Sequence, residues 1–81
     1  MIQSLSQIEL EQRFLASVLN TGLDGYKKLP LNFRATVFSV GAHQEIFKTM
    51  EFMASERLEI DSTSVAKYLP QKLAGELVEI I

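Results

Sequence analysis

Glu11 and His43 are the residues of this sequence whose chemical types and placement best support chemistry. Glu11 falls near the middle of the apolar half of a helix that contains residues 8–19, and His43 falls on the apolar face of a helix predicted over 42–56. A buried carboxylate without a partner costs on the order of several kcal/mol. We therefore expect Glu11 to lie within hydrogen-bonding reach of His43, or of the N–H groups near Ala42 and His43 at the start of the second helix.

A carboxylate beside an imidazole can serve as an acid–base dyad or as a pH-sensitive switch. Here the sequence contains no phosphate-binding loop, no cysteine and only one histidine. The acidic residues Glu56, Glu59 and Asp61 lack the spacing of a calcium loop and are typical of a solvated connector. We interpret Glu11 and His43 as a structural polar tie that fixes how two helices dock, and we predict no catalytic residue, no metal site and no cofactor.

Length and composition indicate one small globular domain spanning residues 1–81. The chain has 81 residues, 47% of them hydrophobic, and a net charge of −2. It contains neither an apolar run of about 20 residues that could span a membrane nor a secretory signal at its start. These features, with the lack of cysteine, lead us to expect a cytoplasmic protein without membrane contact. The absence of a basic excess argues against direct nucleic-acid binding.

Hydrophobic periodicity is helical almost throughout, so we predict an all-α fold. It should be a compact bundle of about five or six short-to-medium helices, with a longer central helix around 42–56. The core face of that helix should consist of Ala42, Ile46, Phe47, Met50, Met53 and Ala54. Ser6 and Glu9 form a capping box at the start of the first helix, and Asn20-Thr21-Gly22 indicates its end. The apolar half of this helix consists of Ile8, Leu10, Phe14, Leu15, Val18 and Leu19. Two short helices are expected at roughly 23–29 and 31–37.

Beyond the central helix, the sequence predicts two further helices. Asp61 or Ser62 should cap the first, with Val65, Tyr68 and Leu69 on its buried side. Pro70 should end that helix and open the last one.

Some aromatic and basic residues are predicted to lie outside the core. Phe52 falls on the polar side of the central helix, and exposed aromatic side chains often anchor partner proteins. Tyr26, Lys27, Lys28 and Arg34 could form a mixed aromatic and basic patch, and we take them with Phe52 as candidate partner contacts. The alternative for both is an ordinary solvated helix surface, which needs no function.

The order of three sequence blocks resembles the N-terminal domain of DnaB-type bacterial replicative helicases. The resemblance spans about residues 8–69 and is carried by core and cap positions. They are Glu9-Leu10-Glu11-Gln12 with Leu15-Ala16, then Phe38, His43 and Ile46-Phe47, then Ile60-Asp61, Thr63 and Val65. Ala16 stands where the family usually has glycine, and one extra residue separates Thr63 from Val65.

This resemblance implies a non-catalytic, helical protein-interaction domain of the replication fork. It would dock primase or a helicase loader and help to organise the helicase ring. The family's subunit-pairing hairpin would follow this region, so we expect a fragment or a small stand-alone relative that is a monomer or a weak oligomer. The helicase-binding C-terminal domain of bacterial primase is similar in fold and remains an alternative, in which the partner is the helicase. A small helix-turn-helix DNA-binding regulator is a second alternative, although the eight basic residues are dispersed.

Overall fold

The described residues of the computed structural model, 7–30 and 33–80, are helical and contain no strand. They form four α-helices and two short 3-10 helices. In chain order these are α1 (Gln7–Lys27), η1 (Ala35–Val37), α2 (Gly41–Ser55), α3 (Ser62–Tyr68), η2 (Gln71–Leu73) and α4 (Ala74–Ile80). The prediction of an all-α bundle is confirmed. The predicted number of five or six helices was slightly too high, because the expected helix over 23–29 is the last part of α1, and residues 35–37 of the one expected over 31–37 form only the short η1.

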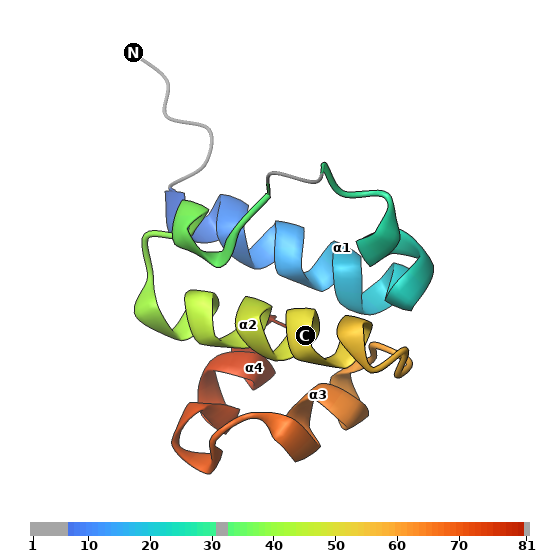
Figure 1. The fold of residues 1–81 in the computed structure, drawn as a ribbon. Helices are drawn as coiled ribbons and strands as arrows, with labels where there is room; N and C mark the ends of the chain where they lie inside the picture. Colours follow the sequence, from blue (N-terminus) through green and yellow to red (C-terminus); the bar gives the residue numbers. More distant parts are fainter. Residues whose placement is uncertain (1–6, 31–32, 81) are drawn as a thin grey trace.

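Helix α2 is the centre of the bundle. Figure 1 shows it between α1 on one side and α3 on the other, and α4 contacts both α1 and α2. Ile46, Phe47, Met50 and Met53 of α2 are almost completely buried. Their spacing of three and four residues puts them on one broad face, so α2 contributes to the packing of every other α-helix. The expected central helix is therefore present, although α1 with 21 residues is longer than α2 with 15.

Helix α1 continues past its predicted end but changes direction there. Gly22 has φ 71° and ψ −153°, which interrupts the helical geometry without ending the element. The expected separate helix over 23–29 is thus the last part of α1. Of the expected helix over 31–37, residues 31–32 lie outside the described part of the chain and residues 35–37 form η1. Glycine permits the kink because it has no Cβ.

A long-range contact holds the kink of α1. The N–H of Leu23 donates a hydrogen bond to Oε1 of Glu59, in the connector between α2 and α3, at 3.3 Å. This bond supplies an acceptor to the backbone donor that directly follows the irregular geometry of Gly22. A Cβ placed on Gly22 would overlap the same carboxylate oxygen.

The connector after α2 begins with a second unusual backbone conformation. Arg57 has φ 58°, which is the left-handed region. The N–H of Arg57 donates to the carbonyl of Ala54 at 3.0 Å, and the N–H of Leu58 donates to that of Met53 at 2.8 Å. This pair of bonds is the Schellman arrangement that ends many helices, usually with glycine in the left-handed position.

Two surface assignments made from periodicity were wrong. Tyr68 was expected to be buried but is 50% exposed, and Ile8 and Leu10 of the predicted apolar half of α1 are 51% and 49% exposed. Periodicity identifies the apolar side of a helix, but whether another element covers that side depends on the tertiary arrangement. Tyr68 instead packs against Phe52, with ring centroids 5.6 Å apart.

Replacing Gly22 with alanine should destabilise the domain. Gly22→Ala combines a strained backbone with a clash against Glu59, and we expect the free energy of unfolding to fall by about 1–3 kcal/mol. Thermal unfolding followed by circular dichroism measures the effect. Gly75→Ala is the matched control, since Gly75 has open space around its Cβ position within α4, and it should keep or raise the melting temperature. Equal responses of the two variants would contradict this account of the kink.

Replacing Arg57 with glycine should stabilise the domain. Arg57→Gly relieves the left-handed strain of a residue with a Cβ, so we expect stabilisation by about 0.5–1 kcal/mol in urea unfolding. Glu56→Gly is the control, because Glu56 has an ordinary φ of −92° and gains only unfolded-state freedom. Destabilisation by both substitutions would show that the left-handed geometry is not costly at position 57.

Candidate functional site

The structure brings Glu11 and His43 together in the interior. Glu11 lies on α1 and is 4% exposed, and His43 lies in the first turn of α2 and is 1% exposed. Their side chains meet at 2.7 Å between Oε1 of Glu11 and Nδ1 of His43. An ionised carboxylate only accepts hydrogen bonds, so Nδ1 carries the proton that is donated in this pair.

The Glu11 carboxylate also accepts bonds from the segment that leads into α2. The N–H and hydroxyl of Ser39 donate to Oε2 at 2.7 Å and 2.8 Å, and the N–H of Val40 donates to Oε1 at 3.4 Å. The Gln7 side-chain amide adds a bond to Oε2 at 2.9 Å. Val40, the N-cap of α2, makes no side-chain cap bond of its own. A carboxylate from another helix therefore occupies the positive end of α2.

These contacts control the ionisation of Glu11. Burial raises the pKa of Glu11, but the hydrogen bonds from the backbone N–H of Ser39, from Gln7, from His43 and from the Ser39 hydroxyl outweigh it. The net result is a pKa of about 2, below the ordinary value of 4.5. Glu11 is thus a carboxylate at neutral pH, with donors at both oxygens. This arrangement fits a structural tie, the role predicted for the pair, because its acceptor atoms are used within the fold.

The predicted cap residues lie in three different situations. Asp61 is the N-cap of α3, and its Oδ1 accepts a hydrogen bond from the N–H of Ser64 at 2.8 Å. Glu9 lies in the first turn of α1 on the exposed side. Ser6, its expected partner in a capping box, lies outside the described residues. Asp61 rather than Ser62 is therefore the cap of α3.

Three of the predicted partner-contact residues line one pocket. Tyr26 and Lys27 reach it from the end of α1, and Arg34 reaches it from the segment before η1. The pocket has a volume of about 420 Å³ and is partly open to solvent. Lys28 does not line it, and Phe52 lies elsewhere, beside Tyr68.

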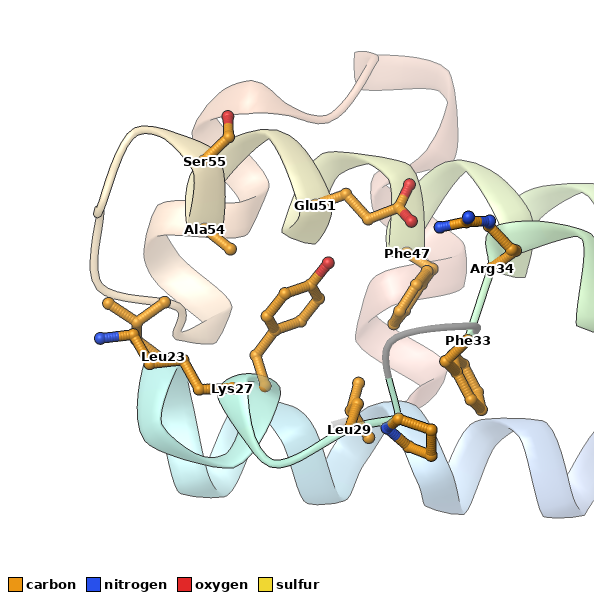
Figure 2. A pocket seen from close by; sticks show the side chains of 11 residues that line it. Leu23, Lys27, Leu29, Phe33, Arg34, Phe47, Glu51, Ala54 and Ser55 are labelled. Atoms are coloured by element: carbon orange, nitrogen blue, oxygen red, sulfur yellow. The ribbon is translucent and has the colours of Figure 1, made fainter.

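The opposite wall of this pocket comes from α2 and was not predicted. From this helix the lining includes Phe47, Glu51, Ala54 and Ser55 (Figure 2). Phe47 and Ala54 were assigned to the core face of α2, and Glu51 was not singled out at all. Their spacing in the sequence gives no signal that they would face Arg34 and Tyr26, because that depends on the path of the chain between α1 and α2.

The comparison with known families identifies this fold. The model of the DnaB-like helicase N-terminal domain matches residues 3–80 of the chain. The chain belongs to this family. The domain that defines the family is non-catalytic and is part of a replicative helicase. The match includes all three blocks on which the sequence resemblance was based, so the resemblance to the helicase domain is confirmed.

Other comparisons add no relative to this family assignment. No curated protein and no solved structure matches the chain.

Within residues 7–30 and 33–80, no group of three or more histidine, cysteine or acidic residues could hold a metal ion. Over the same residues, every helix is too short or too polar to cross a lipid bilayer.

The contribution of Glu11 to stability should be detectable in the pH dependence of the free energy of unfolding. Because the pKa of Glu11 is lower in the folded chain than its ordinary value, its stabilisation is present above about pH 4.5 and is lost as pH falls towards 2. We expect Glu11→Gln to cost about 2–4 kcal/mol at pH 7 and to flatten the fall of unfolding free energy between these pH values. Urea unfolding across this pH range measures both effects. Exposed Glu56→Gln is the control, and an unchanged acid profile in Glu11→Gln would refute the assignment.

Proposed function

We propose that this chain is a non-catalytic docking domain of a helicase at the bacterial replication fork. In this proposal it binds primase or a helicase loader, and it helps to organise the N-terminal ring of the helicase. The observation that carries the proposal is the family match over residues 3–80. The proposed setting is the cytoplasm, and the proposed mechanism is docking of a preorganised helical surface, without a reaction in the domain itself.

The distribution of side chains supports a role at the surface. The buried polar pair, Glu11 and His43, is bonded within the fold. Aromatic side chains that can anchor a partner are exposed or half-buried instead: Phe52 and Tyr68 form one exposed pair, and Tyr26 and Phe33 line the pocket of Figure 2. Interfaces commonly draw most of their affinity from a few such aromatic anchors.

Binding of purified replication proteins tests the proposed function. The immobilised chain should retain primase or the helicase loader encoded by the same genome, with an affinity in roughly the micromolar range for a small transient interface. Biolayer interferometry at increasing salt measures the affinity, which should change little between about 50 and 200 mM salt, whereas DNA binding would weaken steeply.

Each other outcome of the binding experiment supports a different function. Retention of the helicase, without primase or loader, would favour the primase-type alternative. Salt-sensitive retention of a DNA duplex would favour the DNA-binding alternative. Retention of none of these would reject docking at the fork as the function of this chain.

A further inference from the structure

We propose that the pocket between the end of α1 and the second half of α2 binds a peptide segment of a partner protein, one that presents a bulky apolar side chain beside a carboxylate. This inference rests on the proposed docking function and specifies its surface and the chemistry of its partner. It is carried by the aromatic lining of the pocket, by two cations at its rim, and by Glu51 and Tyr26 of the same lining.

The floor of the pocket is aromatic and rigid. Phe33 and Phe47 have ring centroids 5.2 Å apart, and Tyr26 and Phe47 have centroids 5.7 Å apart. Leu29 and Ala54 add aliphatic surface. Phe47 is 1% exposed, so core packing fixes its ring. A volume of about 420 Å³ is enough for a large side chain and part of its backbone. An apolar side chain seated here would cover the half-buried rings of Tyr26 and Phe33.

The rim carries two cations that have no ion-pair partner among the residues described. Lys27 and Arg34 are both exposed, and no salt bridge involves either one within 7–30 and 33–80. Figure 2 shows the Lys27 side chain at one end of the pocket, and Arg34 turned towards Glu51 at the other end. The net charge of the chain is −2, so an acidic segment is not attracted by the domain as a whole. The cations at the rim therefore select for acidic groups locally.

Glu51 determines which end of the pocket accepts the carboxylate. Because Glu51 lies at the Arg34 end, a second carboxylate there meets both a cation and an anion. At the Lys27 end, the pocket lining presents a cation alone. The occupant should thus place its acidic group beside Lys27 and its apolar side chain over Leu29 and Phe33.

Tyr26 adds a neutral donor to the lining of the pocket. Burial, and then the negative charge of Glu51, raises the pKa of Tyr26 above its ordinary value, so its hydroxyl stays protonated. A tyrosine at the edge of an apolar pocket offers its ring to an apolar side chain and its hydroxyl to a polar group. The hydroxyl can therefore donate to the backbone or carboxylate of the bound segment.

Titration with defined peptides tests the pocket without any replication protein. The ¹⁵N-labelled chain is mixed with a capped acidic peptide, acetyl-Asp-Leu-Phe-Asp-Glu-amide, and amide shifts are followed by NMR. We expect shifts confined to residues 23–30, 33–34 and 47–55. A basic version, acetyl-Lys-Leu-Phe-Lys-Lys-amide, should have an affinity at least roughly fivefold lower than that of the acidic peptide. A version of the acidic peptide with serine in place of both Leu and Phe should not bind. Shifts centred on α3 around Tyr68, or equal binding of the acidic and basic peptides, would overturn the proposal.

A charge reversal at the rim links the pocket to the partner protein. Lys27→Glu should lower the affinity of the chain for the acidic peptide roughly five- to tenfold, and Arg34→Glu should lower it by a smaller factor. Lys72→Glu makes the same charge change in η2 and should leave binding unchanged. All three residues are exposed, and circular dichroism checks that the variants stay folded.

The same variants distinguish failure of the pocket from failure of the proposed function. If primase or loader binds the unmodified chain and Lys27→Glu equally well, the pocket proposal is rejected while docking at the fork stands. If the unmodified chain binds neither protein, the proposed function is rejected. The peptide titration then still decides for or against the pocket.

Discussion

The Glu11 carboxylate is the interaction on which the arrangement of α1 and α2 depends. Apolar burial favours contact between the two helices but is not directional, so it fixes neither their rotation nor their offset. The carboxylate adds direction, because its oxygens accept from His43, from both donors of Ser39 and from Gln7. A buried charge is costly unless such donors are in place. Any slippage of α1 along α2 would leave that charge without partners, which penalises alternative dockings.

Ring contacts connect this polar tie to the pocket. Phe38 packs edge-on against His43, with centroids 6.5 Å apart, and lies 5.4 Å from the ring of Phe47. Phe47 in turn contacts Phe33 and Tyr26 in the pocket lining. The position of the pocket floor thus follows from the same docking of α1 on α2 that the carboxylate enforces. The buried pair of Glu11 and His43 and the pocket thus lie at opposite ends of one cluster of packed rings.

The features that could be predicted from sequence are those that depend on neighbouring residues or on helix phase. Helical phase placed Glu11 and His43 on facing apolar stripes, and a local pattern placed Asp61 at the start of α3. The features that escaped prediction depend on contacts between distant residues. Nothing in the sequence near Gly22 indicates that Glu59 would support the kink, because Glu59 lies 36 residues after its bonding partner Leu23. Arg57 in a left-handed conformation likewise lacks the glycine that usually indicates one.

The kink at Gly22 explains why a pocket exists at all. A straight α1 would carry its last turn onward along the original axis, whereas the turn after Gly22 is redirected, and Tyr26 from this turn contacts Phe47 of α2. Glu59 holds the start of this turn through Leu23, and Tyr26 holds its end through Phe47. A segment fixed at two points loses little further freedom when a ligand binds, so little of the binding free energy is spent on ordering the pocket. The pocket proposed as a docking site is in this way preformed, because the connector after α2 holds the kink through Glu59.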